Sequence, residues 1–198
     1  MAVEQGSKLE LDRCPHCNVA KPHLNARSSW ETTSSTNSNQ RFWMTYACES
    51  CGGSVLTAAT TKGSGVLEMY PSSKEVDEAV PDPAREYLRQ AISSLHAPAG
   101  AIMLAASSID AMLKEKGYKD GSLYDRIKQA AKDHLITEEM AVWAHDVRLD
   151  ANDQRHADDQ ASLPDEEDAS KCIEFAQALA EFLFALPARV ERGRKKTP

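Results

Sequence analysis

Two short stretches, Cys14-Pro15-His16-Cys17 and Cys48-Glu49-Ser50-Cys51, decide the fold of the N-terminal part of this 198-residue chain. Each is a Cys-x-x-Cys pair, and 30 residues lie between them. Such pairs form tight turns that present thiolates to a metal, and two pairs complete a tetrahedral four-sulfur site suited to zinc. Because four protein ligands leave no position open for catalysis, we expect a structural Zn²⁺. The predicted ligands are Cys14, Cys17, Cys48 and Cys51.

Other interpretations of the four cysteines are less favoured. Disulfides are unusual in a cytosolic chain, and a redox Cys-x-x-Cys normally sits in a βαβ unit, a pattern that surrounds neither pair. His16 and His23 are alternative ligands, although four thiolates already fill the site. Gly52 and Gly53 follow the second pair and supply the backbone freedom that a tight turn needs.

Residues 1–71 are rich in Ser, Thr, Asn and Gly and predict a small β domain. Alternating patterns predict strands at 41–48, 54–60 and 65–70, and the polar run ETTSSTNSNQ at 31–40 predicts a long hairpin tip. Four aromatic side chains here can stack on nucleobases, but other apolar residues are few, so we expect at least two of them in the core. They are Trp30, Phe42, Trp43 and Tyr46.

Residues 72–83 form a polar, proline-containing connector, and residues 84–188 show the 3.6-residue period of helices. The predicted fold is therefore mainly α, a bundle of four to five helices preceded by a small β zinc ribbon. Residues 189–198 form a basic tail. We expect helices at 84–96, from Pro98 to a stop at Gly117, at 122–134, from an N-cap at Thr137, and from near Pro164.

The expected helices carry apolar stripes that predict the core of the bundle. The fifth stripe includes Cys172, which is most simply a small core residue. The second stripe comprises Ile102, Ala105, Ile109, Met112 and Leu113; the third Leu123, Ile127 and Ala130; the fourth Met140, Trp143, Val147 and Ala151; and the fifth Cys172, Phe175, Ala176, Leu179, Phe182, Leu183 and Leu186.

The stretch Trp143–His156 adds a polar stripe to the fourth expected helix. If the helix continues to His156, then His145, Arg148, Asn152 and His156 share one face. A guanidinium can hold a phosphate and an imidazole can move a proton near neutral pH, so these residues are candidates for a catalytic or binding site. The alternative is that Asn152 and His156 only satisfy buried groups such as the Asp110 carboxylate.

The chain contains 23 Lys or Arg and 30 Asp or Glu, which gives a formal net charge of −7. This balance argues against coating of nucleic acid through bulk charge, although the tail is basic. No run approaches the roughly 18 apolar residues of a membrane span, and the N-terminus lacks the apolar core of a signal peptide. We therefore expect a cytoplasmic protein without a membrane partner, whose fold does not depend on disulfides.

Several short motifs follow one another along the chain. They are the cysteine-pair ribbon, Tyr70-Pro71, Pro81-Asp82-Pro83 before a helix with Tyr87, Ser108-Ile109-Asp110-Ala111-Met112-Leu113, and the series Arg148, Asn152 and His156. Taken in this order, the motifs resemble the bacterial domain of unknown function 4145 family, which is similar to the HEPN superfamily of helical bundles. The resemblance spans Cys14 to about Leu186.

This resemblance implies a HEPN-like helical domain that is commonly a homodimer, in a superfamily that contains metal-independent ribonucleases of toxin and phage-defence systems. By analogy Arg148 and His156 would be the catalytic pair, with Asn152 orienting them and Asp110 as the acidic partner. The chain departs from active members. Seven residues separate Arg148 from His156 instead of four to six, Ala105-Ala106-Ser107-Ser108 lacks the arginine usual before the Asp110-like acid, and nine acidic residues lie from Asp146 to Asp168.

Three functions are consistent with these patterns. The first is a non-catalytic binding module associated with nucleic acid, such as RNA, or with defence. The second is a metal-independent endoribonuclease in which His156 transfers a proton and Arg148 stabilises the phosphate. The third is an adaptor that binds a protein partner through its acidic helices. The polar stripe favours the second, whereas the acidic surroundings and the longer spacing favour the first and third.

Overall fold

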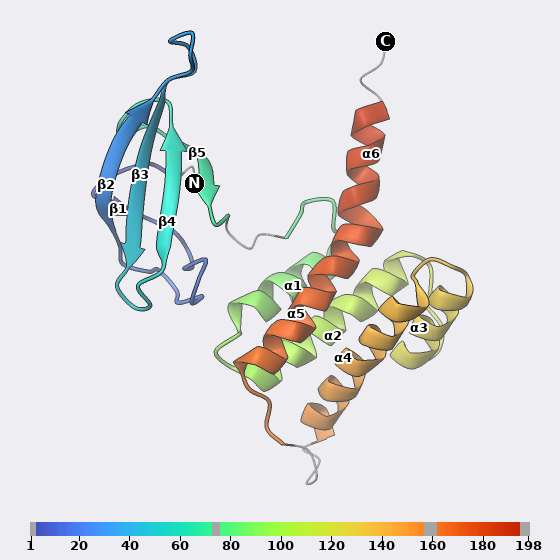
Figure 1. Ribbon diagram of the computed structural model, residues 1–198. Helices are drawn as coiled ribbons and strands as arrows, with labels where there is room; N and C mark the ends of the chain where they lie inside the picture. Colours follow the sequence, from blue (N-terminus) through green and yellow to red (C-terminus); the bar gives the residue numbers. More distant parts are fainter. Residues whose placement is uncertain (1–2, 73–75, 157–161, 195–198) are drawn as a thin grey trace. The chain divides into compact units, whose positions relative to one another are not determined.

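The computed structural model describes residues 3–72, 76–156 and 162–194, and the chain divides into two compact units at residues 1–74 and 75–198 (Figure 1). The first unit is a β-sheet and the second is built from α-helices. No helix within the described ranges is both long and apolar enough to cross a membrane. Because the first unit is a β-sheet, the chain is not purely helical, and each unit has its own hydrophobic core.

The β unit is an antiparallel five-stranded sheet in which neighbouring strands follow the order of the chain. The predicted strands at 41–48, 54–60 and 65–70 correspond to its last three strands, but the first two were not predicted. β2 pairs with β3 along most of its length, yet only Leu24 of its nine residues is buried, so its sequence lacks strand alternation. The strands are β1 (Lys8–Leu9), β2 (Leu24–Thr32), β3 (Arg41–Cys48), β4 (Ser54–Ala59) and β5 (Val66–Tyr70).

The core of the β unit lies on one face of β3, where buried and half-buried residues alternate strictly. Phe42 and Tyr46 belong to this core, which confirms that at least two of the four aromatic residues are structural. The Tyr46 hydroxyl also bonds to the backbone of Gly6 and so attaches the N-terminal segment to the sheet. Trp30 and Trp43 lie on the opposite face.

In the helical unit, α1, α3, α4 and α5 all pack against the apolar helix α2. The buried Ser108 hydroxyl donates to the Ala84 carbonyl at 2.8 Å, which ties α2 to the start of α1. The helices are α1 (Ala84–Ser93), α2 (Pro98–Glu115), α3 (Leu123–Lys132), α4 (Glu138–His156), α5 (Glu166–Ala180), a π-helical segment η1 (Glu181–Ala185) and α6 (Leu186–Arg194).

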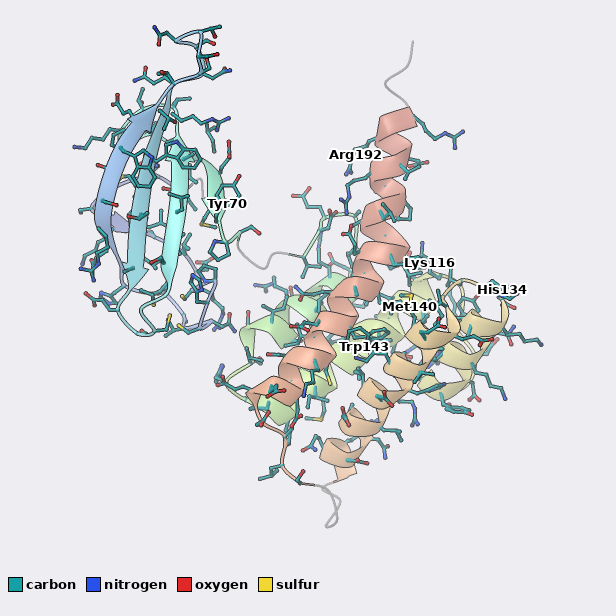
Figure 2. The ribbon with its side chains drawn as sticks, in the orientation of Figure 1. Tyr70, Lys116, His134, Met140, Trp143 and Arg192 are labelled. Atoms are coloured by element: carbon teal, nitrogen blue, oxygen red, sulfur yellow. The ribbon has the colours of Figure 1, made fainter. Side chains whose placement is uncertain are left out.

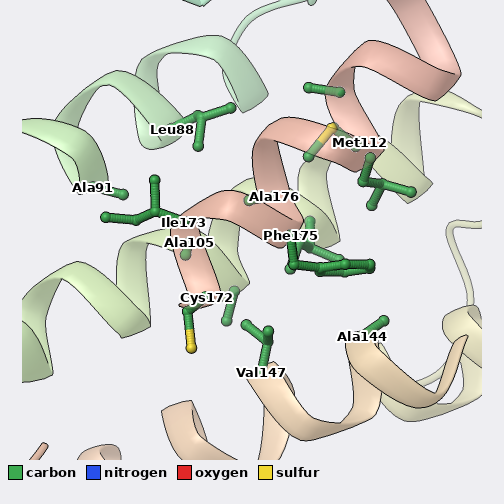
Figure 3. Close-up of a cluster of buried hydrophobic side chains, with 14 of the residues drawn as sticks. Leu88, Ala91, Ala105, Met112, Ala144, Val147, Cys172, Ile173, Phe175 and Ala176 are labelled. Carbon is green, nitrogen blue, oxygen red and sulfur yellow. The ribbon is translucent and has the colours of Figure 1, made fainter. Parts of the chain in front are cut away.

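Most of the predicted apolar stripes are buried, including all five positions of the α2 stripe and Cys172 (Figure 3). Trp143, Phe182 and Leu186 were expected in the core but are exposed. Trp143 lies over the edge of the core with its ring 5.0 Å from that of Phe175. Phe182 lies in η1, where the wider π turn shifts the face of the helix, and Leu186 begins a helix without buried residues.

Two segments of the helical unit have a structure that the sequence patterns did not predict. Val80, within the expected connector, is buried in the core of the helical bundle. Residues 189–194 of the expected tail continue α6 to Arg194, whereas the remaining tail lies outside the described residues. The helix expected from near Pro164 is α5, with Asp165 as its N-cap, and the Asp165 carboxylate accepts hydrogen bonds from the Glu167 and Asp168 N–H groups.

Candidate metal centre and polar helical site

The four cysteines of the two predicted pairs lie together at one end of the β unit. Their Sγ atoms are all within 4.8 Å of one another, and those of Cys14 and Cys51 are 4.0 Å apart. Four sulfurs bound to one ion at about 2.3 Å would be about 3.8 Å apart, so the arrangement fits a tetrahedral metal ion after a small contraction. Cys14 and Cys48 are buried, whereas Cys17 and Cys51 are exposed.

The two cysteine turns have the same backbone construction. In each turn the residue after the second cysteine, Asn18 or Gly52, has a positive φ of 57° or 72°. Its N–H donates to the carbonyl of the first cysteine of the pair, at 2.9 Å or 2.8 Å. Glycine and asparagine are the residues that adopt this left-handed conformation most easily. Asn18 is therefore the counterpart of Gly52, a role that the sequence analysis missed.

His16 has a structural role beside the sulfur cluster. Its Nε2 lies 2.8 Å from the Ser54 carbonyl oxygen, and its ring covers Gly53 so closely that a Cβ there would lie 2.5 Å from the ring. This contact fixes the first cysteine turn against the second and explains the glycine. His23 instead faces the Glu49 carboxylate at 4.0 Å. Among the described residues the candidate metal cluster consists of the four cysteines.

The crowding of the thiols favours a bound cation. A hydrogen bond with the Val19 backbone lowers the pKa of Cys17, but desolvation and the neighbouring Cys51 and Cys14 thiols outweigh it and raise the pKa to about 12. Thiolates at these distances repel one another, and a metal ion removes this cost. The donor set therefore fits a metal ion held for structural purposes, with all four positions supplied by the chain.

The helical candidate site is built on α4, which runs unbroken to His156 as the polar stripe required. Arg148 is half-buried, and its guanidinium carbon lies 5.5 Å from the centre of the Tyr124 ring on α3. The His145 ring is 4.8 Å from the same ring. Asn152 is exposed, and the side chain of His156 lies outside the described residues.

Within the part of the chain that the structure describes, two buried nitrogens of this cluster have no hydrogen-bond partner, the Arg148 Nε and the His145 Nδ1. Burial and the nearby Arg148 charge lower the pKa of His145, so its neutral form dominates at pH 7. Tyr124 was missed by the sequence analysis, because it belongs to another helix and no spacing along the chain relates it to Arg148. The cluster combines an aromatic face, a neutral imidazole and a fixed cation.

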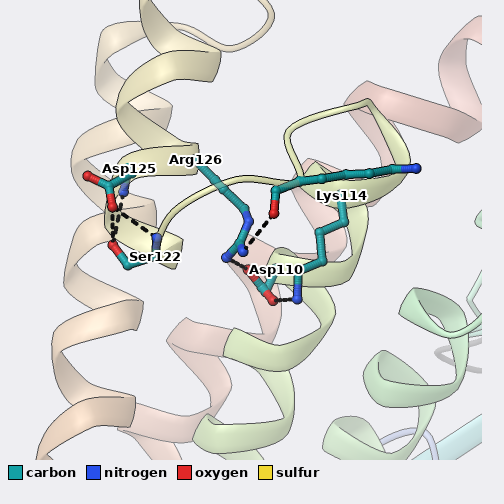
Figure 4. Close-up of polar contacts among 6 residues, drawn as sticks. Asp110, Lys114, Ser122, Asp125 and Arg126 are labelled. Carbon is teal, nitrogen blue, oxygen red and sulfur yellow. Dashed lines mark hydrogen bonds and ion pairs between the residues drawn. The ribbon is translucent and has the colours of Figure 1, made fainter.

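Asp110, the expected acidic partner, is engaged by other residues (Figure 4). One carboxylate oxygen accepts from the Arg126 guanidinium at 2.7 Å, and the other lies 2.5 Å from the Lys114 ammonium. The guanidinium of Arg126 also donates to the Lys119 carbonyl at 3.2 Å. Asp110 therefore joins α2 to α3, and its proposed role beside Arg148 stays a prediction.

The electrostatic surroundings of α4 are strongly negative. Burial raises the pKa of Asp150, and the carboxylates of Asp146, Asp153 and Asp168 raise it further. The Cys172 thiol, 3.7 Å from an Asp150 oxygen, has a pKa raised to about 12 by desolvation and that carboxylate. A phosphate bound near Arg148 would meet this negative field, which weakens the case for catalysis on nucleic acid.

The fold and the sulfur cluster define a two-part protein, in which a β unit with a candidate metal site precedes an α-helical unit. Residues 89–196, more than half of the chain, match the family described as a domain of unknown function (DUF4145), and the chain belongs to that family. The match includes the polar site on α4 and confirms the resemblance read from the motifs. No curated protein and no solved structure shows a significant match.

The sulfur cluster predicts the metal content of the protein. Purified protein should contain one tightly bound metal ion per chain, and Cys51→Ser should weaken metal binding by more than about a hundredfold, because three thiolates cannot complete the site. Elemental analysis measures the metal, and thermal unfolding should show that the β unit melts earlier in the variant. Cys172→Ser, in the other unit, should keep the metal; equal metal content in all three proteins would contradict the assignment.

The lowered pKa of His145 predicts a dependence of stability on pH. Because the unfolded chain takes up this proton near pH 6.5 and the folded chain only at lower pH, stability is full above about pH 6.5 and falls as the pH drops below it. His145→Gln should reduce the loss of unfolding free energy between about pH 7 and pH 5.5. Urea unfolding followed by circular dichroism tests this, with the exposed His96→Gln as control; identical slopes would refute it.

Proposed function

We propose that this protein is a non-catalytic binding module that recognises single-stranded nucleic acid through the outer face of a zinc-stabilised β unit. The helical unit, which we infer to be HEPN-like, is acidic and does not form the nucleic-acid site. Four thiolate ligands make zinc the expected metal. Since the site is closed, zinc stabilises the fold and performs no chemistry.

The observation that carries the proposal is the placement of two tryptophans on the solvent face of the sheet. Trp30 on β2 and Trp43 on β3 are directly paired across the strands, so their side chains lie beside each other on the same face. Trp30 is 42% exposed, so part of its ring is open to a ligand. Aromatic side chains on a sheet face are the platform on which successive unpaired bases stack.

The surroundings of the tryptophan pair suit a polar ligand with flat bases. The Trp43 indole N–H donates to the Thr32 hydroxyl at 2.8 Å, which holds the ring in one orientation. The Ser28 and Thr45 hydroxyls are 2.6 Å apart beside it. The Arg41 guanidinium pairs with the Glu68 carboxylate, so the acid on this face is neutralised. Rigid rings next to hydroxyl groups favour stacking combined with hydrogen bonding.

The distribution of charge also favours the β unit as the nucleic-acid site. Its first 74 residues contain seven Lys or Arg and six Asp or Glu, so the negative charge of the chain falls almost wholly on the helical unit. A polyanion is repelled less by the nearly neutral unit. Stacking, rather than attraction by net charge, must then supply much of the affinity for nucleic acid. The dissociation constant should therefore depend only weakly on salt concentration.

Replacement of either tryptophan tests the proposal directly. Trp30→Ala and Trp43→Ala should each weaken binding of a labelled single-stranded RNA of about 20 nucleotides by roughly ten- to a hundredfold, since a base–aromatic stack contributes about 1–3 kcal/mol. Fluorescence anisotropy measures the dissociation constants. Trp30→Ala should lower the melting temperature only modestly, because its side chain is 42% exposed and lies outside the core of the β unit.

The control for this experiment is Tyr87→Ala, which removes an aromatic side chain of similar exposure from α1. It should bind RNA as tightly as the unmodified protein. Double-stranded RNA of the same sequence should bind more weakly, because its bases are not available for stacking. Unchanged affinity in both tryptophan variants would refute the assignment of the sheet face.

A second candidate function, a metal-independent ribonuclease, is favoured by the unpartnered Arg148 Nε on the continuous helix α4. Our proposal instead expects structured RNA to remain intact when it is incubated with the protein in magnesium-free buffer without chelator. Gel electrophoresis of the RNA decides between them. Cleavage that is lost in Arg148→Ala and His156→Ala would establish the ribonuclease, with those two residues at its site.

A further inference from the structure

Tyr70 is an exposed aromatic residue at the end of β5, in a motif to which the proposed function gives no role (Figure 2). It is 52% exposed. Trp43 on β3 is paired with Ala58 on β4, and Ala58 is paired with Glu68 on β5. Directly paired residues share a face of the sheet, and so do residues two positions apart on one strand. Tyr70 therefore lies on the same outer face as the tryptophan pair, Trp30 and Trp43.

A polar network that crosses the sheet holds the Tyr70 ring. The Tyr70 hydroxyl donates to the Glu68 Oε2 at 2.9 Å, and the Glu68 Oε1 pairs with the Arg41 guanidinium of β3. Ala58 lies on the strand between them, and its short side chain leaves room for the arginine to reach across. The hydrogen bond with the Glu68 carboxylate also raises the pKa of Tyr70, so the hydroxyl stays protonated at neutral pH. One edge of the ring is thus anchored while much of its surface stays open.

The separation between Tyr70 and the tryptophan pair restricts the ligands that can reach both. β5 is two strands from β3, about 10 Å, and Tyr70 is two residues, about 7 Å, further along the sheet than Trp43. Neighbouring bases that stack on one another are only about 3.4 Å apart. A strand that places bases on both positions must therefore be extended, with its bases parted from one another.

The surface between the aromatic positions also suits such a strand. Leu56 is the residue of β4 paired with Tyr70, and its half-buried aliphatic side chain lies on the outer face. It offers an apolar contact to an intervening base. The carboxylate on this part of the face, that of Glu68, is already paired with Arg41 and bonded to Tyr70, so it repels a passing phosphate less.

We propose, on the basis of the function proposed above, that Tyr70 is a third stacking position of the nucleic-acid site. The ligand is an extended, unstacked single strand that crosses the sheet from the tryptophan pair on β2 and β3 to the end of β5. The two tryptophans hold one part of the strand, and Tyr70 holds a base further along it. Strands too short to cross the sheet make no use of Tyr70.

The length of the oligonucleotide tests this assignment on the metal-loaded full chain. Oligouridylate is the probe, because its bases stack on one another only weakly. Tyr70→Leu should raise the dissociation constant for a labelled strand of about twelve nucleotides by roughly tenfold, as measured by fluorescence anisotropy. Tyr70→Phe keeps the ring and should raise it by less than about threefold. A uridylyl dinucleotide, followed by quenching of tryptophan fluorescence, should bind Tyr70→Leu and the unmodified protein equally.

The matched control is Tyr87→Leu on α1, which makes the same change at another exposed tyrosine and should not alter binding. Because Tyr70 is exposed, Tyr70→Leu should lower the melting temperature only modestly. An equal loss of affinity for the dinucleotide and the long strand would overturn the proposal, since Tyr70 would then act through the fold.

The tryptophan variants separate this proposal from the function on which it rests. If Trp30→Ala and Trp43→Ala weaken binding of the long strand but Tyr70→Leu does not, the sheet face binds nucleic acid without Tyr70, and only the third position is refuted. If none of the three variants changes the affinity, the proposed function fails as well. A loss in all three, confined to the long strand for Tyr70→Leu, is the expected result.

Discussion

The β unit depends on the convergence of four cysteine sulfurs, because its apolar core alone is small. The segment between β1 and β2 contains the first cysteine pair, and its β pairing is an isolated bridge between Arg13 and Ala20. The turn between β3 and β4 contains the second pair. A metal ion shared by these turns would fix the ends of the four strands that flank them, and His16 against Gly53 adds a second contact between the turns.

The helical unit reaches stability by ordinary burial and needs no cross-link. Small side chains on α2 let four helices approach it closely, and Asp110 forms an ion pair with Arg126 near the start of α3. The two units therefore differ in their physical properties. The β unit is almost neutral, carries the candidate metal cluster and has aromatic side chains on its outer face, whereas the helical unit is acidic and has the larger apolar core.

Local patterns in the sequence were enough to predict β3, the starts of most helices, the buried stripe of α2 and the four clustered cysteines. Each of these follows from spacing within one element. The failures come from contacts between elements. β2 joins the sheet through its neighbour despite its polar surface, and Trp143 stays 41% exposed although its ring lies 5.0 Å from that of Phe175. Tyr124 beside Arg148 could not be foreseen for the same reason, since no pattern along the chain relates them.

The π segment Glu181–Ala185 gives the last helix a property that the core of the bundle does not have. It accommodates one more residue per turn than an α-helix would, so the helix after it points a different face to solvent while the helix before it keeps its packing. Insertion or deletion of a single residue in this segment therefore rotates the helix that follows about its axis and leaves the packing of the preceding helix in place. Within a family that shares this bundle, the outward face of the C-terminal helix can thus diverge by one-codon steps while the interior stays constant.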